Sequence, residues 1–279
     1  MNILTFDIED WYNCDFISEN FNWNNYEVRI YDGVGRILDE LAKHKIKGTF
    51  FCLGWLAENH PSIIKRIHDE GHQVGCHSYQ HQLATRFSPD SFRADTYKAK
   101  SLIEDVIGES VACFRAPGFS ITHKNLWAFD VLHELGFKYD CSIFPAHHDY
   151  GGMPDYGSSQ PAILLRNGYE IKEFPINIHR LFGKNLVFSG GGFFRLFPYW
   201  LIKKWGKEAP YMMTYFHPRD FDPDQPVIKE LPKVRKFKSY VGLKHSFAKF
   251  QKILTDFDFV NVAQANDVID WSSAKRINL

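Results

Sequence analysis

Two histidines separated by three residues, His77 and His81, are the side chains in this chain best suited to chemistry. Residues four apart lie on one face of a helical turn, so these imidazoles can close on one metal ion. A carboxylate would complete a three-ligand site with open positions, which a hydrolytic metal needs. Asp7 and Asp10, in the run Thr-Phe-Asp-Ile-Glu-Asp, are the candidates for that ligand. The pattern predicts a metal-dependent hydrolase.

Three acids stand within four residues near the start of the chain: Asp7, Glu9 and Asp10. They follow Ile3 to Asp7, which has the pattern of a buried strand. A single acid at the end of a strand is usually a helix cap. Three carboxylates this close repel one another unless a cation lies among them. The cluster therefore favours a functional role.

Two further motifs offer an orienting group, an oxyanion donor and an acid. Arg115 stands two residues before Pro117, and a fixed guanidinium can hold a carboxylate through two hydrogen bonds. Gly118 lets a substrate approach the backbone, so its N–H is a candidate oxyanion donor. His217 ends an apolar strand, and Pro218 restricts its backbone to an extended form, which suits a positioned general acid. Taken singly, these motifs are also compatible with a surface turn and a structural histidine.

Alternating strands and helices must position these residues. The candidates fall at or just after the ends of predicted strands, the edge where α/β barrels carry their chemistry. This alternation predicts a mostly parallel sheet or barrel. In the first half we expect strands at 3–7, 48–52, 73–76, 111–114 and 137–140, and helices at 34–46, 61–71, 90–107 and 124–135. Later we expect a loop at 145–170, strands near 170–174, 186–188, 212–216 and 257–262, and a helix at 243–254, with 222–240 unassigned.

Composition narrows the class of protein. The chain has 279 residues, enough for one large domain, and 33 basic residues balance 33 acidic ones, which argues against a nucleic acid partner. Five scattered cysteines predict reduced thiols and not a disulfide framework. The sequence shows neither a leader peptide nor an apolar run of roughly 20 residues that would span a bilayer. We therefore expect a cytoplasmic enzyme.

In their order along the chain, these motifs resemble the polysaccharide deacetylases of the NodB-homology type, carbohydrate esterase family 4. The matching segments are Thr5–Asp10, His77–His81, Arg115–Pro117, Tyr139–Pro145 and Tyr215–His217. A subgroup linked to bacterial surface-polysaccharide synthesis shares further segments: Glu173–Pro175, Gly190–Arg195 and Tyr240–Gly242. The resemblance implies one catalytic domain over 1–279, with a core at about 3–220 and a C-terminal extension at about 221–279. It also implies a distorted (β/α) barrel of seven or eight parallel strands.

The resemblance also implies a role for each residue. Asp10, His77 and His81 would hold a divalent metal, most commonly Zn²⁺, with Co²⁺, Ni²⁺ or Mn²⁺ tolerated. The family usually has two adjacent acids, but Asp7 is followed here by Ile8, so Glu9 stays open as the carboxylate ligand in place of Asp10. Asp7 would be the base and Arg115 its orienting group. The Gly118 N–H would stabilise the oxyanion, His217 would protonate the leaving amine, and Asp140 would tune the pKa of His217.

The implied substrate is an N-acetylated sugar or oligosaccharide, with a lipid- or nucleotide-linked carrier among the options. Two other classes stay open: a metal-dependent hydrolase of small cyclic amides on the same fold, and a non-catalytic carbohydrate-binding relative. The aromatic and Lys-rich segment Gly190–Lys207 has two interpretations as well. It either rests on a membrane surface, which would place the enzyme at the inner face of the membrane, or packs in the core.

Overall fold

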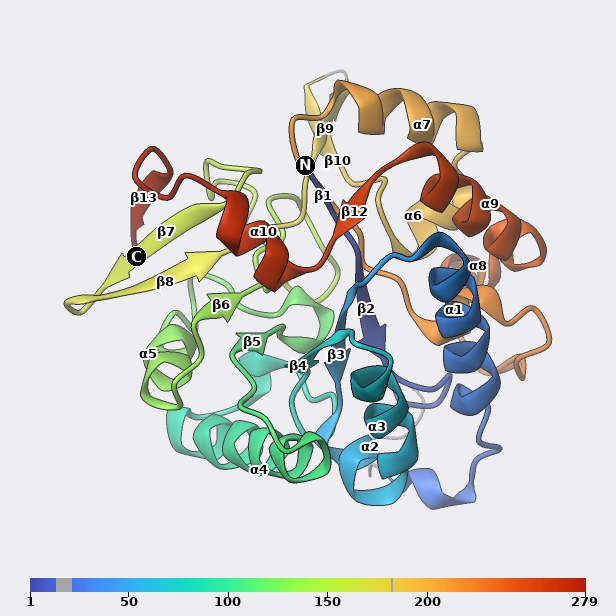
Figure 1. The fold of residues 1–279 in the computed structure, drawn as a ribbon, viewed down its shortest axis with the longest axis horizontal. Helices are drawn as coiled ribbons and strands as arrows, with labels where there is room; N and C mark the ends of the chain where they lie inside the picture. The colour runs from blue at the N-terminus through green and yellow to red at the C-terminus, as the bar shows by residue number, and fades with distance from the viewer. Residues whose placement is uncertain (14–21, 182) are drawn as a thin grey trace.

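The computed structural model describes residues 1–13, 22–181 and 183–279. Within these residues an eight-stranded sheet has the order β13-β7-β8-β6-β5-β4-β3-β2, and a three-stranded sheet has the order β11-β1-β12. The strands of the two sheets are β1 (Asn2–Ile3), β2 (Thr5–Ile8), β3 (Thr49–Cys52), β4 (Gln73–Cys76), β5 (Cys113–Phe114), β6 (Tyr139–Asp140), β7 (Ala162–Arg166), β8 (Tyr169–Glu173), β11 (Met212–Met213), β12 (Phe259–Val260) and β13 (Lys275–Asn278). Apart from the antiparallel pair β7–β8, the neighbours in these sheets are parallel. The architecture is a distorted α/β barrel, as predicted (Figure 1).

The first segment of the chain joins the two sheets. β1 pairs with β11 and β12, while β2, one residue further on, pairs with β3. A bridge between Phe6 and Phe216 continues the contact toward the end of β2, and another joins Gly190 to Tyr215. A Cβ on Gly190 would lie 2.3 Å from the Tyr215 carbonyl oxygen, so only glycine permits this approach. The residues after β11 are thereby held beside β2.

Helices cover the outside of the strands (Figure 1). They are α1 (Ile30–His44), α2 (Gly54–Asn59), α3 (Pro61–Asp69), α4 (Pro89–Ile107), α5 (Trp127–Glu134), α6 (Gly191–Leu196), α7 (Tyr199–Glu208), α8 (Lys233–Tyr240), α9 (Leu243–Asp256) and α10 (Val262–Val268). α4 shows how the sequence defines their ends. Ser88 accepts a hydrogen bond from the Ser91 N–H at the start, and Gly108 adopts a left-handed conformation at the end.

An aromatic cluster packs where the ends of the chain meet. Phe6 of β2 stacks on Phe50 of β3 with ring centroids 4.7 Å apart. Phe250 of α9 packs edge-on against both Phe6 and Phe216. All four rings are fully buried. Such pairs add about 0.5–1.5 kcal/mol each beyond the burial of their area. They stabilise the seam between β2 and the strand that leads to His217.

The first half agrees with the predicted elements apart from the short α2, which was not predicted, and the second half departs from them. The segment 145–170, expected to be a loop, contains β7, and the unassigned 222–240 contains α8. β7 pairs with β13, more than a hundred residues away, and such long-range pairing leaves no local signal. The strand expected near 186–188 is instead β10 (Lys184–Leu186), which forms an antiparallel hairpin with β9 (His179–Leu181).

The segment proposed to rest on a membrane divides between core and surface. Phe194 and Trp205 are buried in the core, whereas Trp200 is 67% exposed. No helix in the described residues has both the length and the apolar character needed to cross a bilayer. Membrane contact through α6 and α7 stays a prediction. Cys52, Cys76, Cys113 and Cys141 are buried free thiols, and Cys14 lies outside the described residues.

Candidate active site

Three potential metal ligands come together at the ends of β2 and β4. Glu9, His77 and His81 each offer one ligand atom, and these atoms all lie within 4.8 Å of one another. The ring centroids of the two histidines are 5.2 Å apart. The helical turn expected to bring the rings together is wrong: Ser78 (φ 67°) and His81 (φ 56°) are left-handed, so a tight irregular turn does so instead.

Hydrogen bonding and burial prepare this cluster for a cation. His77 Nδ1 lies 2.8 Å from the Arg115 carbonyl, which can only accept, so Nδ1 carries the proton and Nε2 presents its lone pair. Burial lowers the pKa of His77 to about 4, which keeps the ring neutral. Burial raises the pKa of Glu9, but the neighbouring His81, His217 and His77 outweigh it and lower the value to about 2. The cluster thus offers an ionised carboxylate and a neutral imidazole.

The carboxylate at the cluster belongs to Glu9, which corrects the prediction of Asp10. Asp10 Oδ2 accepts hydrogen bonds from the backbone N–H groups of Arg29 and Ile30, at 2.7 and 2.9 Å. Its Oδ1 accepts another from the Trp11 N–H. Asp10 therefore satisfies backbone donors at the start of α1, and burial raises its pKa to about 6. The sequence alone does not show which of the neighbouring acids, Glu9 or Asp10, is the metal ligand; only the fold distinguishes their roles.

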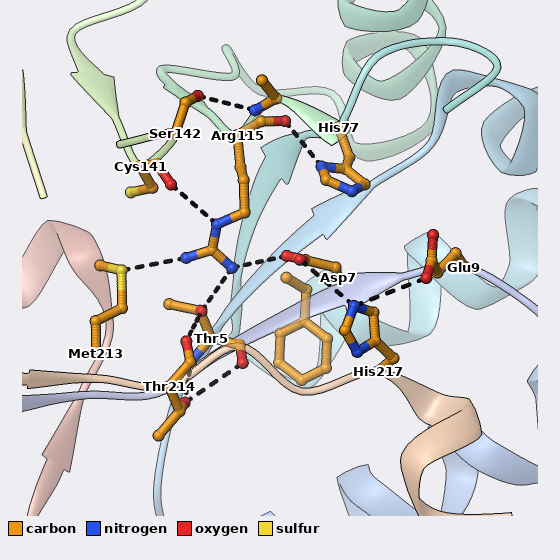
Figure 2. Close-up of polar contacts among 12 residues, drawn as sticks. Thr5, Asp7, Glu9, His77, Arg115, Cys141, Ser142, Met213, Thr214 and His217 are labelled. Carbon is orange, nitrogen blue, oxygen red and sulfur yellow. Dashed lines mark hydrogen bonds and ion pairs between the residues drawn. The ribbon is translucent and has the colours of Figure 1, made fainter. Parts of the chain in front are cut away.

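Asp7 and Arg115 form the buried ion pair that the sequence predicted. Arg115 Nη1 donates to Asp7 Oδ1 at 2.7 Å and to the Thr5 hydroxyl at 2.8 Å, while Nε donates to the Cys141 carbonyl (Figure 2). The Arg115 side chain is completely buried. Because Arg115 occupies Oδ1 of Asp7, the other oxygen, Oδ2, is directed toward His217 Nε2, 3.8 Å away. This arrangement suits a carboxylate that accepts a proton.

His217 approaches the same point from the segment after β11, which lies beside β2. Its Nε2 lies 3.8 Å from Asp7 and 3.7 Å from Glu9 Oε1 (Figure 2). Its Nδ1 contacts Asp220 Oδ2 at 2.9 Å, and the same oxygen accepts the His217 backbone N–H. Burial lowers the pKa of His217, but Asp220 and then Glu9 and Asp7 outweigh it and raise the value to about 9. His217 is therefore protonated at neutral pH.

Asp220, which the sequence reading missed, takes the role predicted for Asp140. Asp220 is buried and ion-paired with Arg195, whose Nε lies 3.1 Å from its Oδ1. Arg195 donates in turn to the carbonyls of Ser239 and Lys238. The available signal was the spacing His217-Pro-Arg-Asp220, because an acid three residues after the start of a helical turn can reach back to its first N–H.

Asp140 instead supports the loop that carries Arg115. Its two oxygens accept hydrogen bonds from the N–H and the hydroxyl of Ser142, both at 2.8 Å. Ser142 Oγ accepts the Ala116 N–H, next to Arg115. Burial and the charge of Asp140 raise the pKa of the neighbouring Glu173, so this pair retains a proton. Asp140 acts on the backbone around Arg115 and has no contact with His217.

The predicted base and acid and the cluster of possible metal ligands line one cavity of about 160 Å³. Asp7, Glu9, His77, His81 and His217 form its polar wall. Leu83, Phe119, Tyr150 and Tyr215 form an apolar wall, together with Gly118. Gly118 has a φ of 59°, where a side chain would be strained and would meet Leu83 and Tyr150. Gly118, the predicted source of the oxyanion donor, thus lines the same cavity as the predicted base and acid.

The donor set fits a divalent transition metal ion. Two imidazoles and one carboxylate are the ligands of many hydrolytic zinc sites, and they leave coordination positions open. Glu9 Oε2 lies 2.7 Å from His81 Nε2, yet within the described residues it receives no well-aligned hydrogen bond. A buried oxygen and a ring nitrogen this close without mutual alignment are suited to a shared cation.

Two family models match consecutive parts of the chain. "Polysaccharide deacetylase" matches residues 4–139, and a domain of unknown function, DUF3473, matches residues 141–267. The site draws on both parts, since Asp7 and His77 fall in the first and His217 in the second. The eight-stranded sheet also crosses the junction, because β6 pairs with β5 on one side and with β8 on the other.

Curated relatives match about a third of the chain. A peptidoglycan-N-acetylglucosamine deacetylase of Bacillus cereus is 37% identical over 94 residues, 33% of this chain and 34% of that protein. A peptidoglycan-N-acetylmuramic acid deacetylase of Bacillus subtilis is 32% identical over 82 residues, 29% of this chain and 31% of that protein. The chain therefore spans about a third of the length of these relatives, which differ in the sugar that their names specify.

Solved structures share the fold over the whole chain. A Mycobacterium smegmatis protein assigned to the polysaccharide deacetylases has a TM-score of 0.66 at 19% identity, covering 100% of this chain and 92% of its own. A carbohydrate esterase family 4 pseudoenzyme of Bacillus anthracis has a TM-score of 0.52 at 16% identity, covering 99% and 66%. Because the fold occurs in a pseudoenzyme too, activity must be argued from the site.

Proposed function

Because the chain belongs to the polysaccharide deacetylase family, we propose that it is a metal-dependent hydrolase that removes an N-acetyl group from an amino sugar of a glycan. One observation carries this proposal. Asp7, held by Arg115, lies 3.8 Å from the protonated His217, and both line a cavity that is also lined by the Glu9, His77 and His81 cluster. A base, an acid and a metal site thus adjoin one small cavity, as amide hydrolysis requires.

The residues divide the reaction between them. Glu9, His77 and His81 would hold the metal ion, which when bound polarises the acetyl carbonyl and acidifies water. Asp7 Oδ2 accepts the proton of the attacking water, since Arg115 occupies Oδ1. His217 Nε2 donates a proton to the nitrogen as the carbon–nitrogen bond breaks. Acetate and a free amino sugar leave.

Asp220 and Gly118 complete the arrangement. Asp220 keeps His217 protonated and fixes its ring through Nδ1. The Gly118 N–H would be the donor to the developing oxyanion, since Gly118 lines the same cavity as Asp7 and His217. Leu83 and Phe119 on the apolar wall of that cavity suit the methyl of the acetyl group.

Three finer points belong to the proposal. Zn²⁺ is the expected metal, with Co²⁺, Ni²⁺ or Mn²⁺ as substitutes, because two imidazoles and a carboxylate accept several ions. We propose bacterial surface-polysaccharide synthesis as the setting, supported by the shared segments Glu173–Pro175 and Gly190–Arg195. A cytoplasmic location and a lipid- or nucleotide-linked substrate stay predictions.

Acetate release tests the function directly. The zinc-loaded protein is incubated with N-acetylated oligosaccharides, and the products are examined by mass spectrometry for loss of one acetyl group. Asp7→Asn should lower turnover about 10²–10⁴-fold, because a general base contributes that much, while metal content is unchanged. An Asp7→Asn variant as active as wild type would rule out Asp7 as the base. Hydrolysis of a hydantoin with no acetate release would favour the cyclic-amide alternative.

A further inference from the structure

A buried serine is hydrogen-bonded to the peptide that carries the predicted oxyanion donor. Ser120 is completely buried, and its hydroxyl donates to the Pro117 carbonyl at 2.6 Å. The Ser120 N–H donates to the same carbonyl at 3.2 Å. This carbonyl belongs to the peptide between Pro117 and Gly118, so it shares one rigid plane with the Gly118 N–H. Ser120 thus holds the plane in which the predicted donor lies.

The geometry of this peptide determines the direction of the donor. The described residues contain no cis peptide bond, and in a trans peptide the carbonyl and the N–H point to opposite sides. The Gly118 N–H therefore points away from Ser120. Gly118 lines the cavity of about 160 Å³, whereas Ser120 is not among the residues that line it. A hydrogen bond to the carbonyl also polarises the peptide and makes its N–H a stronger donor, because hydrogen bonds in a chain reinforce one another.

Further hydrogen bonds hold the serine itself. Ser120 Oγ accepts the Ala84 N–H at 2.8 Å, and Asn125 Nδ2 donates to the Ser120 carbonyl at 3.1 Å. Because the single proton of the hydroxyl is directed to Pro117, the oxygen is left to accept from Ala84. Ala84 stands three residues after His81, one of the possible metal ligands. The hydroxyl therefore links the segment of the metal ligands to the turn of the predicted oxyanion donor.

The turn itself does not require this side chain. The Ser120 N–H alone closes the turn onto the Pro117 carbonyl, as in any helical turn, and the hydroxyl adds a second, shorter hydrogen bond to it. We propose that Ser120 is a positioning residue for deacetylation, which holds and polarises the peptide whose N–H stabilises the oxyanion. Ser120 acts through Gly118 and does not touch the substrate. This role rests on the proposed function.

A variant without the hydroxyl tests this role. Ser120→Ala should lower kcat about ten-fold, which is part of the roughly 10²–10³-fold that a complete oxyanion donor contributes. KM should stay within about two-fold of wild type, with metal content unchanged, since the oxyanion forms only in the transition state. Thr122→Val is the matched control, because it removes a hydroxyl of the same loop that donates to Asn125 and not to Pro117. It should leave kcat close to that of wild type.

A transition-state analogue separates positioning from a general loss of structure. In a methylphosphonamidate of glucosamine, a tetrahedral phosphorus with an anionic oxygen replaces the planar acetyl carbonyl. The inhibition constant of this analogue should rise in Ser120→Ala by the same factor as kcat falls. Ser120→Cys fills the same space with a weaker donor, so both changes should be smaller there than in Ser120→Ala.

The outcomes distinguish this role from the proposed function. A kcat unchanged in Ser120→Ala, an inhibition constant that does not follow kcat, or an equal loss in Thr122→Val would overturn the role of Ser120 alone. Where Ser120→Ala does not fold, wild-type kcat and inhibition constant in Ser120→Cys would overturn it as well. No acetate release by the wild-type protein would contradict the proposed function, and the role of Ser120 with it.

Discussion

The two halves of the chain contribute to the active site in different ways. The residues from the first half are called the first wall here, and those from the second half the second wall. The wall from the first half of the chain consists of side chains at the ends of neighbouring parallel strands: Asp7 from β2, His77 after β4 and Arg115 after β5. The wall from the second half has one histidine held by irregular segments. Asp220 fixes His217, Arg195 of α6 pairs with Asp220, and carbonyls of α8 hold Arg195. Strand ends repeat a local pattern, but the second wall depends on contacts between distant segments.

The first wall should be the more sensitive to substitution, since it holds the metal ligands. Glu9→Ala and His77→Ala should each abolish bound metal and nearly all deacetylation, because a two-ligand site binds weakly. Asp10→Asn is the matched control, since its amide oxygen still accepts from the start of α1. It should retain metal at a cost of about 1 kcal/mol in stability. Metal analysis checks both, and normal metal content in Glu9→Ala would return the ligand role to Asp10.

The second wall can be tested through the leaving group. Asp220→Asn should slow amide hydrolysis about ten-fold or more, because His217 is less readily protonated and less well oriented. Hydrolysis of p-nitrophenyl acetate should change much less, since its leaving group departs without a proton. The ratio of the two rates is the measurement.

Asp140→Asn provides the comparison for Asp220. Asp140 contacts Ser142 and not His217, so its substitution should lower stability and affect amide and ester hydrolysis alike. If Asp140→Asn and not Asp220→Asn changed the ratio of the rates, the original prediction would be right and the assignment to Asp220 wrong.

The same contrast explains how far the sequence could predict the site. Asp7, His77, Arg115 and His217 stand at the ends of apolar runs, so period-2 patterns and turn residues were enough to bring them to one edge. Asp220 and Asp140 look alike in sequence, and only the return of the chain beside β2 decides which acid reaches His217. Glu9 and Asp10 differ by one position, and a slip of one residue reverses the direction of a side chain.

Prediction of the fold from the sequence meets a similar limit. The strands β3 to β6 and the helices α3, α4 and α5 follow local hydrophobic patterns, and their predicted positions are confirmed to within a few residues, whereas the short α2 was not predicted. β7 and β13 pair over a separation that local patterns do not register, and α8 has no buried residue to give it a periodic signal. The second half of the barrel is thus specified by long-range packing more than by local propensity.

The smallest expected effect is the loss of protein stability in acid that arises from a histidine near the first wall. His72, at the entrance to β4, is buried, and its Nδ1 accepts the Gly48 N–H at 3.2 Å, so the folded state requires a neutral ring. Burial, with help from Lys47, lowers its pKa to about 4. Because the unfolded ring has a pKa near 6.5, the unfolded state binds more protons below that value, and stability falls as the pH drops from about 6.5 to about 4.

His72 alone lowers the free energy of unfolding by at most about 3 kcal/mol between pH 6.5 and 4. His72→Gln retains a side-chain acceptor for Gly48 but carries no titratable proton, so its free energy of unfolding should vary less between pH 6.5 and 4 than that of wild type. Urea titrations at both pH values measure the difference. His68→Gln, a histidine on the surface of α3, is the control and should follow wild type. Equal pH slopes for His72→Gln and wild type would mean that the acid sensitivity arises elsewhere, with the second wall as the next place to look.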